Sequence, residues 1–411
     1  KIIAEGLFAS PLWPINLSLF FSDTSRSSLN TISNTALEDD SGGYDVIVVG
    51  AAAAGIGIGI ALAHVGIERF LIIDRDTIGS SFSSWPDETR FITPSFPSNS
   101  IGMLDLNSIA VGISPAFSMK IEHPTGSDYA EHLQDIASFF ELPVRENMDV
   151  IGISKNDDFF HVETNDRVLY AKNVIWAAGE FQYPCLRGFD GSELCRHTAT
   201  IANYGSLEGD DFLIIGGYES GVDAAYHLAS NDKRVRLFDI DSPWDEDSSD
   251  PSVSLSTYSF ERMRRAEFQK NVELFPRTPV SSVSLMEQVY EIKTEDGQIF
   301  KSNVQPLLAS GFEGSHKFVS HLFDKREDGF PLLNEQDEST IEPGMFLCGP
   351  SVRHDNHDFC FIFKFRQRFA IVAQAIASSL EIGTDEFVEA YRGWGMYLDD
   401  LSCCGQECLT C

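Results

Sequence analysis

Four of the eight cysteines of this chain lie within its last eleven residues, at Cys403, Cys404, Cys408 and Cys411. An adjacent pair of cysteines can carry electrons as a reversible disulfide, and four thiolates can hold zinc or another soft metal. Cys403 and Cys404 are neighbours in sequence, which suits two ligands of one tetrahedral site poorly. Structural disulfides or unpaired thiols are the third interpretation, and the nearby acids Asp399 and Asp400 disfavour a strongly activated thiolate. We therefore predict that Cys403 and Cys404 are redox-active and that no metal is bound.

A first glycine-rich turn, Gly50-Ala-Ala52-Ala-Ala-Gly55, follows an apolar run at 44–50 that is typical of a buried parallel strand. A helix is expected over 51–66 and a second strand over 69–76. Such a turn needs a first glycine for the bend, a small second residue for close approach to a pyrophosphate, and a third glycine for helix packing. The helix N-terminus then offers N–H groups to phosphate. Asp74 ends the second strand, where a carboxylate can bind ribose hydroxyls, so we predict a dinucleotide site; packing alone is the other interpretation.

A second unit of the same kind has a strand at 211–217, a helix at 218–230 and a strand at 234–241. Its turn carries Gly216 and Gly221, but Tyr218 stands where the second small residue belongs. That side chain could block a pyrophosphate or cover a flavin. Asp239 and Asp241 end the second strand without a nearby Lys or Arg, so a 2′-phosphate would meet acids and NADH is favoured over NADPH. A degenerate domain retained for its shape is the alternative.

Two histidines form another group with possible chemistry. His354 and His357 alternate with acids just before a helix expected over 359–380. Imidazoles near a redox site can donate protons. A solvated turn is the competing interpretation, and the phenylalanines that follow are best explained as core.

Composition excludes several classes of function. Against 30 basic residues stand 62 acidic ones, for a net charge of −32, and such a surface repels nucleic acid and anionic lipid. The early apolar stretch at 8–21 holds Pro11 and Pro14 and is too short to span a bilayer. The remaining cysteines are scattered singly, unlike a secreted disulfide framework. We therefore expect a cytoplasmic protein without nucleic-acid or membrane partners, and a homodimer is one expected assembly.

The order of these patterns predicts an α/β fold with two Rossmann-like dinucleotide-binding domains, the second inserted into the first. A helix is expected from Ser127, hairpins over 159–179 and 289–303, and a short strand at 345–350. The predicted divisions are an N-terminal extension (1–43), a first domain in two parts (44–204 and 309–385), a second domain (205–308) and a Cys-rich tail (386–411).

With these motifs in place, the chain resembles flavin-containing monooxygenases and thioredoxin-reductase-like flavoproteins over about residues 44–380. The resemblance rests on the first turn with LIID, on IGSSFSSWP (78–86) and RFITPSF (90–96), on VIWAAGEFQYP (174–184) and on GGYESGVDAA. It implies FAD in the first domain and a nicotinamide coenzyme in the second. The residues it implies near FAD are Gly50, Ala52, Gly55, Asp74, Arg75, Trp85, Val150, Ala178, Gly179, Gly349 and Pro350.

The chain also departs from that family. Monooxygenases carry Phe, Gly and His at fixed spacing between the domains, and here His197 lies two residues too far along. Thioredoxin reductases carry a Cys-x-x-Cys pair near the flavin, and here Cys185 and Cys195 are too far apart for one. Neither family's reaction is therefore carried over, and the resemblance implies an FAD-dependent oxidoreductase that takes electrons from NAD(P)H. Because of the tail cysteines, we expect it to pass electrons to, or take them from, a thiol, disulfide or other sulfur group, with Cys403 and Cys404 as candidate carriers. The alternatives are a monooxygenase acting on a small organic substrate and a non-enzymatic flavin- or metal-binding sensor.

Overall fold

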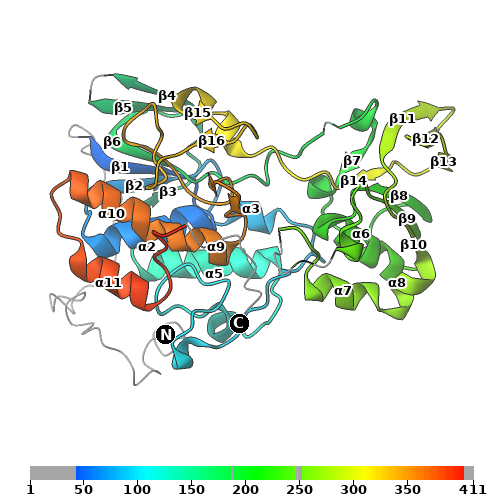
Figure 1. Ribbon diagram of the computed structural model, residues 1–411, viewed down its shortest axis with the longest axis horizontal. Helices are drawn as coiled ribbons and strands as arrows, with labels where there is room; N and C mark the ends of the chain where they lie inside the picture. Colours follow the sequence, from blue (N-terminus) through cyan, green and yellow to red (C-terminus); the bar gives the residue numbers. More distant parts are fainter. Residues whose placement is uncertain (1–42, 157, 187, 247, 249–251, 402–411) are drawn as a thin grey trace.

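The first sheet of the protein forms the part on the left of Figure 1. The computed structural model describes residues 43–156, 158–186, 188–246, 248 and 252–401. Seven strands pair in the order β3-β2-β1-β6-β5-β4, with β17 beside β6. β4 and β5 join through antiparallel pairs, whereas β1, β2, β3, β6 and β17 pair in parallel. The strands are β1 (Tyr44–Val49), β2 (Phe70–Ile73), β3 (Val144–Arg145), β4 (Val150–Asn156), β5 (Phe159–Thr164), β6 (Val168–Trp176) and β17 (Met345–Leu347).

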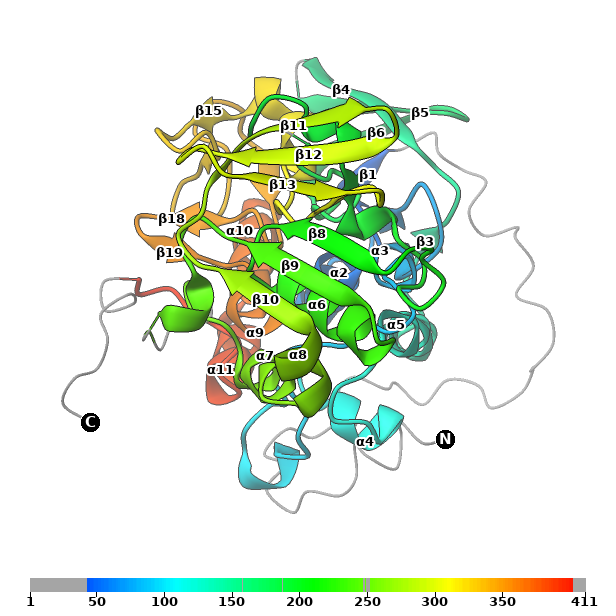
Figure 2. The ribbon, with the colours of Figure 1, turned by 90° about the vertical axis from the view of Figure 1, so that its right-hand side faces the viewer.

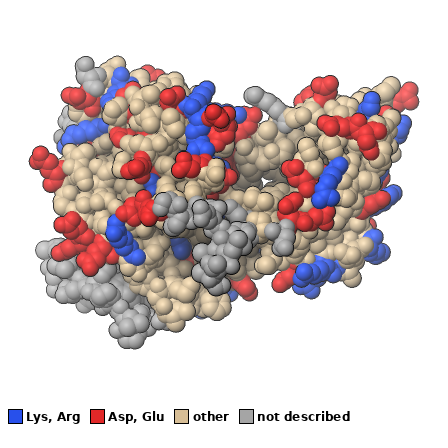
Figure 3. All heavy atoms as spheres, in the orientation of Figure 1, with Lys and Arg blue, Asp and Glu red and all other residues tan. Residues whose placement is uncertain are grey.

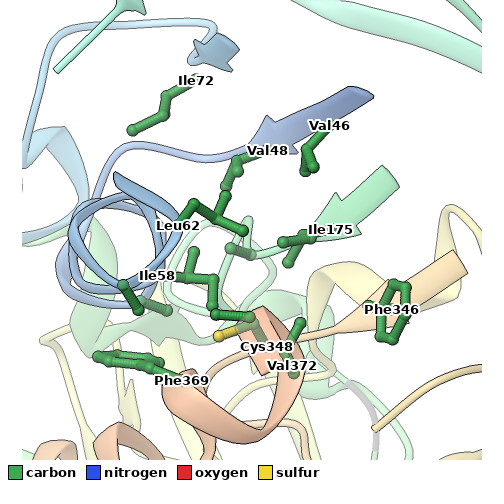
Figure 4. Close-up of a cluster of buried hydrophobic side chains, with 14 of the residues drawn as sticks. Val46, Val48, Ile58, Leu62, Ile72, Ile175, Phe346, Cys348, Phe369 and Val372 are labelled. Carbon is green, nitrogen blue, oxygen red and sulfur yellow. The ribbon is translucent and has the colours of Figure 1, made fainter. Parts of the chain in front are cut away.

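Three helices complete the core around this sheet: α2 (Ala53–Val65), α5 (Gly126–Phe139) and α10 (Phe369–Ser379). α2 is apolar on nearly all faces, which is why it lies almost wholly buried. Figure 4 shows Ile58 and Leu62 of α2 in one buried cluster with Phe369 of α10 and side chains of the strands. Helix α5 begins at a capping box in which Thr125 and Asp128 satisfy each other's backbone N–H groups. The packing of α2 against α10 and the strands fixes the start of α2 relative to the sheet.

The second sheet lies on the right of Figure 1 and faces the viewer in Figure 2. Its order is β10-β9-β8-β14-β7, and all its pairs are parallel. In sequence, these strands lie between β6 and β17, which are neighbours in the first sheet. The strands are β7 (Arg196–His197), β8 (Asp211–Ile215), β9 (Arg234–Phe238), β10 (Val272–Phe275) and β14 (Leu307–Leu308), with helices α6 (Glu219–Ser230), α7 (Thr257–Met263) and α8 (Ala266–Asn271).

Smaller elements complete the described chain. A three-stranded antiparallel sheet of β11 (Val280–Met286), β12 (Val289–Thr294) and β13 (Ile299–Ser302) adjoins the second sheet (Figure 2), and it includes the expected hairpin. The other short elements are α3 (Ser80–Ser83), α4 (Pro115–Met119), β15 (Asp324–Lys325), β16 (Pro331–Leu332), β18 (Arg353–His354) and β19 (His357–Asp358). Among the described residues, no helix combines the length and apolar character needed to cross a bilayer.

The single helix expected over 359–380 is wrong in detail. The structure has a short α9 (Ile362–Phe365), a 3-10 turn at Arg366–Arg368, and then α10. The reason lies in long-range contacts: Arg368 is 1% exposed and pairs with the buried Asp337. Arg366 donates to backbone carbonyls of Asp105 and Ser108. These contacts hold both guanidinium groups inside the protein, and the helix is interrupted where they are made.

The predicted tail also begins with ordered structure. Helix α11 (Asp385–Gly393) packs its Phe387 and Tyr391 against the core of the first sheet. The hydroxyl group of Tyr391 lies 3.0 Å from Nδ1 of His64 on α2. Cys403 and Cys404 lie outside the described residues.

Candidate cofactor and substrate cavity

The first glycine-rich turn joins β1 to α2 at the closest approach between strand, helix and the end of β6. A Cβ on Gly55 would lie 1.8 Å from the carbonyl oxygen of Gly50, and a Cβ on Gly50 would lie 2.5 Å from that of Ala177. Gly50 also has φ of +110°, in the region that favours glycine. No side chain other than hydrogen fits at either position. The two glycines therefore fix the place of the α2 N-terminus.

The N-terminus of α2 is suited to a phosphate group. Its N-cap, Ala52, makes no side-chain cap, and the first turn holds no acid. The first N–H groups of the helix thus lack side-chain partners and carry the positive end of the helix dipole. Ala52, Ala53 and Ala54 all line a cavity. These features fit the pyrophosphate of a dinucleotide, which would be the anchor of FAD here.

Asp74 ties the end of β2 to the turn. Its Oδ2 accepts a hydrogen bond from the N–H of Ala51 at 2.7 Å, and its Oδ1 accepts one from Asp76 at 2.9 Å. Burial raises the pKa of this carboxyl group, while the two N–H donors lower it. Each oxygen retains a lone pair that a ribose hydroxyl can use.

The other residues predicted near a flavin are distributed around this turn. A Cβ on Gly349, just after β17, would lie 3.1 Å from the Cβ of Ala54, so the returning strand does reach the start of α2. Trp85, Gly179 and Pro350 line the cavity. Val150 is the first residue of β4. This strand begins near Asp74, because the N–H of Met148 donates to the Asp74 carbonyl oxygen at 2.8 Å. Arg75 is exposed beside Asp76, and Ala178 packs on the core.

The second turn repeats the backbone geometry of the first. A Cβ on Gly221 would lie 1.8 Å from the Gly216 oxygen, and a Cβ on Gly216 would lie 2.3 Å from the oxygen of Ala309 at the end of β14. Asp239 takes the place of Asp74: its Oδ2 accepts from the N–H of Gly217 at 2.6 Å, and its Oδ1 accepts from Asp241 at 2.8 Å.

Side chains distinguish the second turn from the first. The ring of Trp244 covers Gly217, since a Cβ there would lie 2.2 Å from Cζ3 of Trp244. Tyr218 packs against the core of the second sheet and donates its hydroxyl hydrogen to the Ser254 carbonyl at 3.3 Å. Glu219, in the first turn of α6, accepts from the N–H of Ser256 at 2.5 Å and from the Ser259 hydroxyl at 2.6 Å. The second turn therefore shares the backbone geometry of the first, but the ring of Trp244 covers its Gly217.

A cavity of about 390 Å³ lies between the two turns. Figure 3 shows the surface hollowed between the part with the first sheet and the part with the second. Aromatic side chains form much of its wall: Phe82, Trp85, Phe91, Phe181, Tyr204, Phe312, Phe361 and Phe365. Because residues 52–54 and residues 219–220 both belong to the wall, one space connects the starts of α2 and α6.

A buried ion pair stands at the end of this cavity nearer α6. Asp223 is 5% exposed and pairs with Arg262, which is 4% exposed. Asp223 also accepts a hydrogen bond from the Thr89 hydroxyl group at 2.6 Å. Because Asp223 lies on α6 and Thr89 lies between β2 and β3, this contact connects the second sheet's part of the chain to the first sheet's part. Burial raises the pKa of Asp223, but the hydrogen bond with His227 and the charge of Arg262 outweigh it and lower the pKa to about 2. The carboxyl group is therefore ionised and positions Arg262 in the wall.

His354 and His357 lie on the hairpin of β18 and β19, and neither belongs to the cavity wall. Nε2 of His354 is 2.5 Å from Oδ1 of the fully buried Asp337, which also binds Arg368. Nδ1 of His357 lies 3.1 Å from the His354 carbonyl oxygen. The contacts of His354 are those of a structural cluster, and a proton-donor role for either histidine stays a prediction.

Sequence reasoning missed several residues of the wall. Asp223, Arg262 and Thr89 come from remote segments, and nothing in the sequence marks them as partners. Glu180 directly follows the turn Ala177-Ala178-Gly179, and Glu219 lies within the turn from Gly216 to Gly221, so proximity to these turns was the available signal for both. Cys360, one of the singly scattered cysteines, also lines the cavity, with its Sγ 3.1 Å from the Ser252 hydroxyl oxygen.

Comparisons with known proteins agree with this geometry. The family model described as pyridine nucleotide-disulphide oxidoreductase matches residues 47–349. An uncharacterized CzcO-like oxidoreductase of Geobacillus kaustophilus is 32% identical over 197 residues, covering 47% of this chain and 53% of that protein. The chain spans about half the length of the first curated relatives that it matches.

Solved structures share the fold. The bacillithiol disulfide reductase Bdr of Staphylococcus aureus matches with a TM-score of 0.67 and 18% identity, over 82% of this chain and 98% of that one. A flavin-containing monooxygenase of Stenotrophomonas maltophilia matches with a TM-score of 0.62 and 15% identity, over 82% and 99%. The resemblance drawn from the motifs is confirmed, as is the mixed α/β fold.

Proposed function

The chain belongs to the pyridine nucleotide-disulphide oxidoreductase family, and from this premise we propose that it is an FAD-dependent enzyme that moves electrons from NAD(P)H to a disulfide or related sulfur group. FAD would occupy the first glycine-rich turn, held by the α2 N-terminus, Asp74 and the segment around Gly349. The coenzyme would bind at the second turn. FAD supplies two-electron transfer between coenzyme and substrate when bound.

One observation carries the proposal: a single cavity connects the two equivalent turns. Electron transfer from a coenzyme to a flavin requires the two rings to meet, and this cavity is the space in which they could do so. The matching geometry at Gly55 and Gly221 supports two Rossmann-like dinucleotide-binding domains, the second inserted into the first.

The sulfur acceptor is supported by the relatives. The Staphylococcus aureus neighbour is a bacillithiol disulfide reductase, so a small thiol-derived disulfide is the substrate class we favour. The aromatic wall suits a small organic molecule rather than a folded protein surface. NADH is favoured over NADPH, because Asp239 and Asp241 would repel a 2′-phosphate.

Anaerobic mixing with NADH or NADPH tests the proposal. We expect the yellow flavin absorbance to bleach, NADH to act faster, and a small disulfide such as cystine to restore the absorbance while two thiols appear per coenzyme oxidised. Protein purified without flavin absorbance, or flavin that neither coenzyme bleaches, would contradict it.

The role of the tail needs a separate test. Removal of residues 402–411 is expected to abolish turnover with a disulfide but to spare flavin reduction, if Cys403 and Cys404 carry electrons to the substrate. Unchanged turnover would reject the shuttle and leave reduction to the cavity itself.

A monooxygenase acting on a small organic substrate is the second candidate. It is favoured by the FITPSF stretch at 91–96, whose Phe91, Ile92 and Thr93 line the cavity, and by the missing internal Cys-x-x-Cys pair. Coenzyme-dependent oxygen consumption that rises with an added substrate, without thiol formation, would favour this candidate.

A further inference from the structure

Glu180 occupies a distinctive place in the cavity wall. It follows directly after Ala177-Ala178-Gly179, the turn that ends β6, and it lines the cavity together with Gly179 and Pro350. The N–H of Ser315 donates to the Gly179 carbonyl at 3.0 Å, and that of Tyr183 donates to the Glu180 carbonyl at 2.9 Å. The backbone on both sides of Glu180 is therefore fixed, beside the site we assign to the flavin.

The carboxyl group of Glu180 is less engaged than the other two in the same wall. Asp223 is bound by Arg262 and Thr89, and Glu219 by Ser256 and Ser259. Within the described part of the chain, no hydrogen bond or ion pair involves the Glu180 side chain. A carboxylate without partners in a largely aromatic wall is costly, and protonation removes that cost.

The charges near Glu180 agree with a neutral carboxyl group. Burial raises its pKa, and Arg353 on β18 opposes this effect. Arg353 is itself neutralised by Asp358, with Nε 2.7 Å from Oδ1. The remaining charged or titratable groups of the cavity wall are Arg90, Tyr204, Glu219, Asp223, Arg262 and Cys360.

We propose that Glu180 is the proton donor for the substrate in this cavity, a role that rests on the function proposed above. Cleavage of a disulfide into two thiols takes two electrons and two protons, and anionic reduced FAD, when bound, would supply the electron pair and one of the protons. One sulfur leaves as a thiol and the other as a thiolate. The proton on Glu180 passes to that thiolate, which leaves two thiols, oxidised FAD and a Glu180 carboxylate that water protonates again.

The first test separates the two half-reactions. Positioned acids contribute roughly 10²- to 10⁴-fold to rate, so Glu180→Gln is expected to slow reoxidation of the reduced flavin by cystine about 100-fold. Reduction of its flavin by NADH should match the wild-type rate. Glu180→Asp keeps a carboxylic acid at this position. It should restore part of the reoxidation rate, and that rate should again decrease at high pH, where the acid loses its proton. Glu193→Gln, an exposed glutamate outside the cavity, is the matched control.

The second test does not depend on turnover. Infrared spectra at neutral pH are expected to show the C=O stretch of a protonated carboxyl group in the wild type and in Glu193→Gln, and its loss in Glu180→Gln. Wild-type reoxidation rates in Glu180→Gln, or an unchanged infrared band, would overturn the role of Glu180. A wild type whose reduced flavin ignores disulfides would instead overturn the proposed function, and the infrared result would still decide the protonation state of Glu180.

Discussion

The two glycine-rich turns have nearly the same backbone but present different surfaces to a ligand. In each, a Cβ on the last glycine would lie 1.8 Å from the oxygen of the first, and an aspartate accepts the next N–H. Neither helix has a side-chain cap, but the first turn of α2 holds no acid, whereas that of α6 holds Glu219, and the ring of Trp244 covers the adjacent Gly217. The glycines set the shape of a turn, and the side chains around it decide what binds and how tightly. We call the turn from Gly50 to Gly55 the open turn and the turn from Gly216 to Gly221 the covered turn. We infer that the open turn holds FAD permanently and that the covered turn holds a coenzyme that binds and dissociates.

The largest expected effect on cofactor content comes from disrupting the open turn. Gly55→Val would force α2 away from β1, because its Cβ has no room beside the Gly50 oxygen. We expect loss of nearly all bound flavin and a decrease of about 1–3 kcal/mol in the free energy of unfolding. Flavin absorbance per chain and chemical denaturation measure the two effects. Gly383→Val is the control, since nothing lies within 4 Å of a Cβ there; full flavin content in Gly55→Val would contradict the assignment.

The largest expected effect on stability concerns the ion pair between the turns. Asp223→Asn leaves Arg262 buried without its carboxylate, which typically costs about 3–5 kcal/mol in the free energy of unfolding. The folded-state pKa of Asp223, about 2, lies below its ordinary value of 3.8. Its charge therefore stabilises the fold above about pH 4, and this contribution disappears as the pH falls toward 2.

Denaturation of wild type and Asp223→Asn across this range measures the effect. The difference in unfolding free energy between the wild type and Asp223→Asn should reach its full value near neutral pH and decrease in acid. Asp210→Asn, which breaks the exposed pair with Lys233, should cost less than about 1 kcal/mol. Equal costs for the two variants would contradict the structural importance of the buried pair.

A smaller effect is expected when the covered turn is opened. Trp244→Ala removes the ring that lies on Gly217, so the coenzyme no longer has to displace it. We expect the dissociation constant for NADH to fall by about tenfold, equivalent to roughly 1.4 kcal/mol. Isothermal titration of the FAD-loaded protein gives this constant. A weaker NADH complex would show instead that Trp244 is part of the coenzyme site.

The smallest expected effect is a change of coenzyme preference. Asp241 is exposed at the end of β9, and its N–H already supports Asp239. Asp241→Arg places a positive charge where a 2′-phosphate would lie, so NADPH should gain a few-fold over NADH, about 1 kcal/mol. The ratio of the flavin-reduction rates with NADPH and with NADH measures this preference. An unchanged ratio would indicate that the adenosine of the coenzyme binds elsewhere.

Local patterns in the sequence were enough to predict both strand–turn–helix units, the hairpins and the short strand at 345–350. Each depends on residues close together in the chain, such as Gly50 with Gly55. The break between α9 and α10 could not be predicted, because it follows from Arg368 binding Asp337 far away in the sequence. The cavity shows the same limit: Thr89, Asp223 and Arg262 meet only after the two sheets have assembled.

The most direct measurement compares the wild type with Gly221→Val under anaerobic conditions, following flavin absorbance after addition of NADH. We expect both proteins to carry FAD and dithionite to bleach both, because the first turn is intact in each. NADH should bleach only the wild type, because a Cβ at residue 221 disrupts the coenzyme turn. Bleaching of Gly221→Val by NADH at the wild-type rate would contradict the division of roles between the two turns.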